Sequence, residues 1–182
     1  MFSRRSLIVA VVIIALAASL PGVAGDVADM PPYEFDPADL EITLQRRSCY
    51  GMCPTYDLVI RGDGHGVFTG HKFVKELGER TFDVKPRDVI ALLQQFYDVG
   101  FFDLREIYES RPNPRLTPEG RVQTLTMMVE NGQPPILSIR ICEYSKSVIL
   151  GVGSPPGTRE LAAAVDTLAV SSRFVGEMSE RH

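Results

Sequence analysis

Residues 40–73 read LEITLQRRSCYGMCPTYDLVIRGDGHGVFTGHKF and contain two segments, 41–45 and 56–61, in which apolar and polar side chains alternate. In the first segment Ile42 and Leu44 fall on one face, and in the second Leu58 and Ile60 do so. Such alternation is typical of strands with one buried face. Residues 62–64 are Gly-Asp-Gly, and these residue types accept the positive φ of a tight hairpin turn. The stretch therefore predicts an antiparallel meander.

The pattern continues with a fourth strand, a helix that runs from Pro86 to Gly100, two more strands and a last helix. The strands are expected at about 41–45, 56–61, 66–73, 80–84, 122–129 and 136–142, with a further short strand possible at 148–152. Residues 110–120 contain three prolines and are expected to form an exposed loop. This order predicts the α+β class: an antiparallel sheet of about six strands with two helices, in the order ββββαββα, and with both helices on one face.

The N-terminus has the pattern of a secretory leader. Arg4 and Arg5 precede an apolar run over residues 7–20. This run is shorter than the roughly 20 residues of a membrane-spanning helix. Small residues then predict cleavage after Ala24 or Gly25. The sequence predicts a periplasmic or secreted protein; a twin-arginine route and an uncleaved anchor remain alternatives.

We expect a signal peptide over residues 1–25, a flexible tether over 26–39, one α+β domain over 40–176 and a disordered tail over 177–182. Without the leader, 17 basic residues face 23 acidic ones, so the net charge is −6. An acidic domain with no basic cluster is a poor binder of nucleic acid or anionic membranes. We expect no stable membrane span after cleavage of the leader.

The most specific local feature is a pair of cysteines, Cys49 and Cys53, between the first two strands. In an oxidising compartment a disulfide is the default for such a pair. Gly51 allows the chain to turn, and Pro54 favours an extended conformation at Cys53. A loop this short predicts a stabilisation of roughly 2 kcal/mol.

A thiol-redox site is the main alternative for this pair, with Arg46, Tyr50 and Tyr56 around the turn. Thioredoxin-type sites have the shorter Cys-x-x-Cys spacing at the start of a helix, whereas a proline and a strand follow here. A zinc site needs about four ligands, and the sequence does not group that many, so we expect no metal. The third cysteine, Cys142, is expected to be a buried free thiol, with covalent dimerisation as an alternative.

The segment from Arg46 to Tyr56 resembles a family of small exported bacterial domains with the motif Arg-x-x-Cys-x-Gly-x-Cys-Pro-x-Tyr. The resemblance extends over roughly residues 40–174. At Thr117-Pro118 the family pattern would place Thr-Asp, so any chemistry of that Asp is missing here. The family is a domain of unknown function, so the resemblance implies a compartment and boundaries without an activity.

Two functional hypotheses follow from the sequence. The first is an exported non-catalytic module that binds a protein, a component of the cell envelope or a small ligand, with no cofactor and with the disulfide as a structural element. The second is a periplasmic thiol-redox protein or enzyme acting at the Cys49–Cys53 turn. In either case the candidate functional surface comprises Arg46, Tyr50, Gly51, Pro54 and Tyr56.

Overall fold

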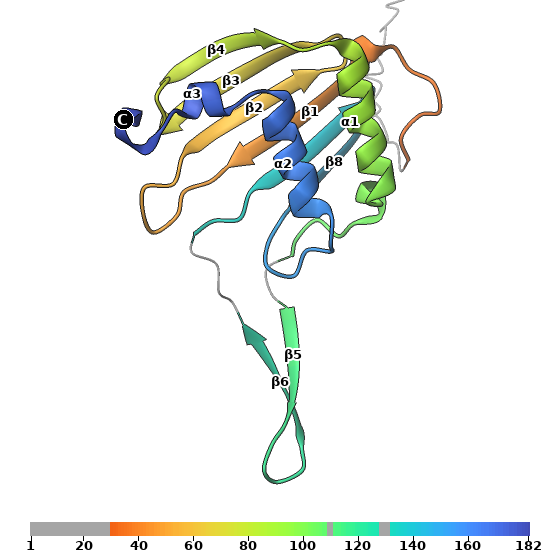
Figure 1. The fold of residues 1–182 in the computed structure, drawn as a ribbon. Coiled ribbons are helices and arrows are strands. Elements are labelled where there is room, and N and C mark those ends of the chain that lie inside the picture. Colours follow the sequence, from red (N-terminus) through yellow and green to blue (C-terminus); the bar gives the residue numbers. More distant parts are fainter. Residues whose placement is uncertain (1–29, 109–110, 128–131) are drawn as a thin grey trace, which may run out of the picture.

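The computed structural model describes residues 30–108, 111–127 and 132–182. Six antiparallel strands form the main sheet in the spatial order β4-β3-β2-β1-β7-β8 (Figure 1). Their bounds are β1 Leu40–Arg46, β2 Thr55–Arg61, β3 His65–Lys72, β4 Gly78–Asp83, β7 Ile136–Ile141 and β8 Tyr144–Ile149. The predicted α+β class with an antiparallel six-stranded sheet is confirmed.

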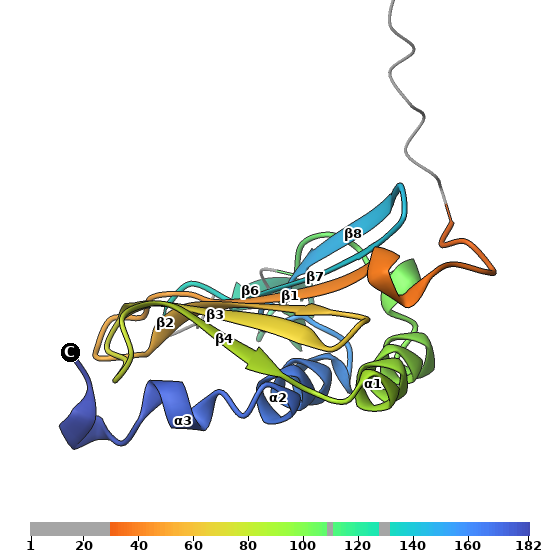
Figure 2. The ribbon, with the colours of Figure 1, turned by 90° about the horizontal axis from the view of Figure 1, so that it is seen from above.

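The helices α1 (Pro86–Asp98), α2 (Thr158–Leu168) and the short α3 (Ser172–Val175) cover one face of this sheet (Figure 2). Alternate residues of β1, Leu40, Ile42 and Leu44, are fully buried against them. The apolar face of α1 and that of α2 complete the core. No helix within the described residues is long and apolar enough to cross a membrane.

The region after α1 differs from the prediction. Residues 110–120 were expected to form a loop, but β5 (Arg111–Leu116) pairs with β6 (Val122–Met127) in a separate two-stranded sheet. Pro112 and Pro114 are two residues apart, so the N–H groups that both prolines lack belong to the same edge of β5. β5 pairs with another strand on one side only, and a strand tolerates proline along an edge that forms no hydrogen bonds. We call residues 111–127 the arm; it projects away from the body (Figure 1).

The strand β8 takes the place in the main sheet that the sequence pattern assigns to a strand at about 122–129. It pairs with β7 over its whole length, from Ile136↔Ile149 to Ile141↔Tyr144. A tight turn at Cys142, which has a φ of 52°, joins the two strands. The main sheet therefore contains four strands that are consecutive in the chain, β1 to β4, followed by two more, β7 and β8. The arm is inserted between these two groups.

The C-terminal residues, for which the sequence predicts a disordered tail, lie against the end of β3 in the structure. Met178–Glu180 forms a 3-10 helix, η3. The backbone of His182 then bonds to Phe73 and Val74 at the end of β3. An ion pair of 2.9 Å between Lys75 and Glu180 supports this contact. Backbone pairing of this kind has no periodic sequence pattern, which explains why it was not predicted. The predicted leader lies outside the described residues.

Candidate functional site

The loop between β1 and β2 is closed by the predicted disulfide. Cys49 and Cys53 are bonded, with their Cα atoms 5.7 Å apart. The backbone N–H of Gly51 donates to the Sγ atom of Cys49 at 3.3 Å. Pro54 and then β2 follow Cys53, so the chain does not enter a helix after the second cysteine. The structure of the loop is thus that of a covalently closed turn between two strands.

This loop is fastened to the chain segment that leads into β7. Gly132 forms an isolated antiparallel bridge with Cys49, and the N–H of Gln133 donates to the carbonyl of Ser48 at 2.8 Å. The side chain of Arg47 also donates, to Gln133 Oε1 at 3.2 Å. A Cβ atom on Gly132 would lie 2.4 Å from the Cα atom of Cys49. Only glycine permits this approach, which fixes one wall of the site.

A partly buried polar network lies beside the loop, where Arg46 and Tyr56 are paired residues of β1 and β2. Both side chains reach Asp166 on α2. The Nε atom of Arg46 donates to Asp166 Oδ2 at 3.0 Å, and Nη2 donates to the same oxygen. The hydroxyl of Tyr56 donates to Asp166 Oδ1 at 2.7 Å, and the hydroxyl of Ser171 donates to Oδ1 at 3.2 Å.

The charges of the network reinforce one another. Burial lowers the pKa of Arg46, but the adjacent carboxylate of Asp166 outweighs this effect, so the net shift is upward and the guanidinium stays charged. Burial, together with the negative charge of Asp166, raises the pKa of Tyr56 far above its usual value. A carboxylate has about four acceptor positions, and four donors occupy them here. Asp166 is therefore committed to holding the network together and is poorly placed to act as a base.

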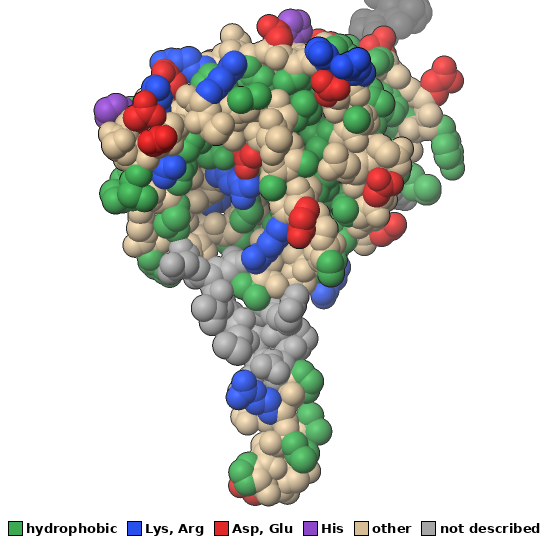
Figure 3. Space-filling view, viewed as in Figure 1, with side chains coloured by type: hydrophobic (Ala, Val, Ile, Leu, Met, Phe, Trp, Pro, Cys, Tyr) green, Lys and Arg blue, Asp and Glu red, His purple; other side chains and the backbone are tan. Residues whose placement is uncertain are grey.

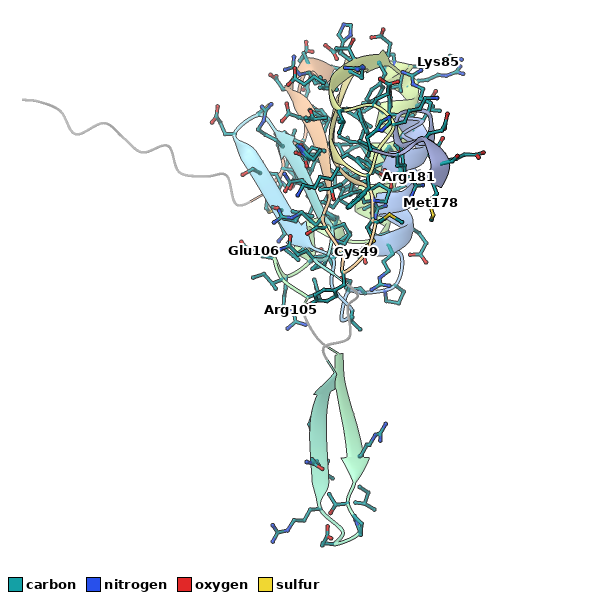
Figure 4. All side chains as sticks on the ribbon, turned by 90° about the vertical axis from the view of Figure 1, so that its left-hand side faces the viewer. Cys49, Lys85, Arg105, Glu106, Met178 and Arg181 are labelled. Atoms are coloured by element: carbon teal, nitrogen blue, oxygen red, sulfur yellow. A yellow bond between two sulfur atoms is a disulfide. The ribbon has the colours of Figure 1, made fainter. Side chains whose placement is uncertain are left out.

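The network forms part of the wall of a cleft of about 750 Å³. Figure 3 shows this face of the molecule, where Lys and Arg side chains lie within a hollow of the body. In Figure 4, Cys49, Arg105 and Glu106 lie at the end of the body nearest the arm, and Lys85 lies at the far end. The lining residues are Arg46, Arg47, Cys49, Cys53, Pro54, Tyr56, Gly132, Gln133, Pro134, Pro135, Leu150, Val152, Arg159, Ala162, Asp166 and Val175.

The structure divides the predicted surface into two parts. Arg46, Pro54 and Tyr56, together with the two cysteines, line the cleft. Tyr50 is 89% exposed, and neither it nor the exposed Gly51 is among the lining residues. These two residues form the outer tip of the loop. The loop residues that line the cleft are those nearer the strands, Cys49, Cys53 and Pro54.

Cys142 lies elsewhere, in the turn between β7 and β8, and is a free cysteine of intermediate exposure. Burial and the neighbouring Asp39 raise the pKa of its thiol. A raised pKa keeps the thiol protonated and less nucleophilic. Among the described residues no group of His, Cys, Asp and Glu side chains could hold a metal ion.

Asp166 was not identified from the sequence, although a pattern points to it. Ala162, Asp166 and Ala169 follow the i, i+4, i+7 spacing of one helix face, and the two alanines are each 1% exposed. A charged residue on a buried helix face requires a partner. The sequence alone does not show that the partners come from β1 and β2.

The chain matches one family model, described as a domain of unknown function (DUF6438), over residues 40–133, just over half of the 182 residues. The matched region contains β1 to β4, the disulfide loop, α1 and the arm. Searches of curated proteins and of solved structures found no match. The expected relationship to a family without a known activity is confirmed at this level, and the chain belongs to the DUF6438 family of domains of unknown function.

Proposed function

We propose that this chain is an exported, non-catalytic binding module whose ligand site is the cleft beside the Cys49–Cys53 disulfide. One observation carries the proposal. The motif residues Arg46, Cys49, Cys53, Pro54 and Tyr56 converge on a cleft of about 750 Å³. This volume falls in the range of small-molecule sites, roughly 300–1,000 Å³.

The contacts of the motif residues support binding rather than catalysis. The oxygens of Asp166 are occupied by donors, and the phenol of Tyr56 is held protonated. The disulfide joins two strands and packs against Gly132. These groups build a preorganised wall, which lowers the entropic cost of binding a ligand.

The experiment that tests the proposal is a thermal-shift screen of small molecules against the wild-type domain and a cleft-filling variant. Val152 lines the cleft and is partly exposed, so Val152→Trp fills the site with little strain on the core. Ile90→Trp on α1, at a residue that is 42% exposed and does not line the cleft, is the matched control.

A ligand at a hundred times its Kd adds about 2.7 kcal/mol. For a domain of this size the melting temperature then rises by about 5–10 °C. We expect this rise in the wild type and in Ile90→Trp, and its loss in Val152→Trp. Compounds that stabilise Val152→Trp as strongly as the wild type would place the ligand elsewhere and overturn the proposal.

Export and bacterial origin form part of the same proposal, supported by the leader pattern and by the disulfide. Expression of the full chain in a bacterium should give a periplasmic protein that begins at Gly25 or Asp26, as measured by intact mass. Replacement of Arg4 and Arg5 by lysine should leave export intact on the general route and block it on the twin-arginine route. A full-length protein in the cytosol would contradict the proposed export.

A further inference from the structure

The arm has two strand edges that pair with nothing in the described parts of the chain. Its strands β5 and β6 pair with each other, and no other described strand joins them. The arm projects from the body in two views at right angles, so the body does not cover these edges (Figure 1, Figure 4). Unpaired N–H and C=O groups along a strand are a template for pairing with another chain. Proteins usually block such edges with charged residues or proline.

The strand β6 lacks such a block, unlike the other edge strands of the described sheets. At the edges of the main sheet, β4 contains Glu79, Arg80 and Asp83, and β8 contains Lys146. In the arm, β5 contains two prolines and two arginines. The sequence of β6 is VQTLTM, with no charged residue and no proline, and its valine and threonines favour a strand. The outer edge of β6 is therefore open to a further strand.

The pairing within the arm determines which backbone groups of β6 point outward. In an antiparallel pair, residues that exchange hydrogen bonds alternate with residues that do not. The N–H of Thr117 donates to the carbonyl of Arg121 at 2.8 Å, and this bond sets the alternation along the arm. Pro114 then lies opposite Thr124 in a pair without hydrogen bonds, as the missing N–H of proline requires. The N–H and C=O groups of residues 122, 124 and 126 thus point away from β5.

We infer that the arm pairs with the arm of a second copy of this chain, through the outer edges of the two β6 strands. In an antiparallel register centred on Thr124, this residue lies opposite Thr124 of the partner subunit, and Val122 lies opposite Thr126 of the partner subunit. All three outward-pointing residues of each β6 strand are then paired. The product is a four-stranded sheet, and three or more strands are what a sheet needs for independent stability, whereas a lone hairpin is marginal.

Two properties of the arm favour a second copy as the partner. A two-fold axis places each residue of β6 opposite a residue of the same strand, so any charge there would face a like charge, and β6 carries none. The prolines of β5 block the opposite edge, so the assembly closes at two copies and does not grow into a fibre. A contact between two short strands is small, so we expect a weak dimer in equilibrium with the monomer.

Sedimentation velocity of the purified mature chain, between about 5 and 500 µM, measures this equilibrium. All samples carry Cys142→Ser, so that a dimer linked through this free thiol is not counted. We expect the mean mass to rise with concentration towards that of a dimer. A chain that stays monomeric at the highest concentration overturns the inference and leaves an extended segment of another protein as the occupant of the edge.

A pair of proline variants locates the contact. Thr124→Pro removes an outward-pointing N–H from the centre of β6 and costs the arm no hydrogen bond to β5. Each copy loses a donor, so dimerisation should weaken by about tenfold or more. Leu116→Pro is the matched control, because it removes an outward-pointing N–H from the edge of β5 and should leave the dimer intact. Equal dimer affinities of Thr124→Pro and the wild type would overturn the inference.

A charge-reversal pair tests the two-fold register. Thr124→Lys places two like charges opposite each other, and Thr124→Glu does the same, so each variant alone should dimerise severalfold more weakly than the wild type. An equimolar mixture places opposite charges across the axis and should restore the association at low ionic strength. Recovery in the mixture also shows that both variants fold. A mixture that associates no more than its components would contradict the pairing at Thr124.

Discussion

The hydroxyl of Tyr56 donates a hydrogen bond of 2.7 Å to Asp166, 110 residues further along the chain. With Arg46 and Ser171, this contact joins β1, β2 and α2 at the edge of the core. The network ties the first strands of the domain to its last long helix. It also forms a wall of the cleft, so the stability of the fold and the shape of the site depend on the same residues.

Asp166→Asn should destabilise the domain. The substitution leaves Arg46 without its counter-charge, and it replaces one acceptor oxygen by an NH2 group, which donates and cannot accept. We expect a loss of roughly 2 kcal/mol in the free energy of unfolding. This is below the value for a fully buried pair because the side chains of Arg46 and Asp166 are 29% and 19% exposed.

Urea denaturation monitored by circular dichroism measures this loss. Asp98→Asn is the control, since Asp98 is exposed on α1 and its Oδ1 accepts from Gln94. The control should lie within about 0.5 kcal/mol of the wild type. Equal stability of Asp166→Asn and the wild type would show that the network does not hold α2 on the sheet.

Stability at alkaline pH should depend on Tyr56. Burial and Asp166 raise the pKa of Tyr56 in the folded state, while the unfolded chain loses this proton near pH 10. The stabilisation linked to this proton is thus fully present below about pH 10 and is lost as the pH rises further, by about 1.4 kcal/mol per pH unit.

Urea midpoints between pH 9 and pH 11 test this linkage. Tyr56→Phe should be less stable at pH 7, where it lacks the hydrogen bond to Asp166, but should lose less stability above pH 10. Tyr33→Phe, at a fully exposed tyrosine, is the control for the substitution itself. If the stability of Tyr56→Phe falls with pH as steeply as that of the wild type, the pH dependence does not come from Tyr56.

The sequence predicted the meander well because its signals are local. Alternation identified β1 and β2, and tight-turn residues separated β2 from β3. The spacing of Cys49 and Cys53, with Gly51 between them, predicted the disulfide once the leader pattern indicated an oxidising compartment. Each of these features depends on residues close together in the chain.

The features that were missed depend on distant residues. The arm contains prolines that argue against a strand, yet β5 is paired on one side only and accepts them. The polar residues of β8 gave little alternation, and its place is set by pairing with β7. Asp166 becomes a site residue only because α2 packs over the ends of β1 and β2.

The disulfide should act as a stabilising link rather than as a redox centre. The double variant Cys49→Ser/Cys53→Ser should lose about 2 kcal/mol in the free energy of unfolding, the value expected for a short loop. The control, Cys142→Ser, should stay within about 0.5 kcal/mol of the wild type. Thiol titration of the unreduced, denatured protein should find only the thiol of Cys142. A pair that mild reductant cycles readily, with a low thiolate pKa, would instead favour the redox hypothesis.

Gly132 should be essential for the wall of the cleft. In Gly132→Ala the new Cβ atom would lie 2.4 Å from the Cα atom of Cys49, so the backbone segments around Gly132 and Cys49 must move apart. We expect a loss of about 3 kcal/mol in the free energy of unfolding, from this clash together with the positive φ of 148°.

Gly120→Ala in the turn of the arm is the matched control. Gly120 also has a positive φ, of 75°, but nothing lies within 4 Å of its added Cβ atom. This variant should lose only about 1 kcal/mol, from backbone strain alone. Equal losses in the two variants would show that the bridge between Gly132 and Cys49 contributes little.

The arm should be dispensable for folding of the body. Its strands pair with each other and do not belong to the six-stranded sheet. A two-stranded hairpin alone is marginally stable, so replacing residues 111–127 by Gly-Ser-Gly should change the free energy of unfolding by less than about 1 kcal/mol. The replacement retains Gly132 and the cleft wall, so ligand binding in the cleft should also persist. Deletion of β8 provides the contrast, because it leaves β7 unpaired along one edge and removes Val148, which is fully buried in the core. If the arm variant unfolds as readily as the β8 variant, the arm contributes to the core and the division into body and arm is wrong.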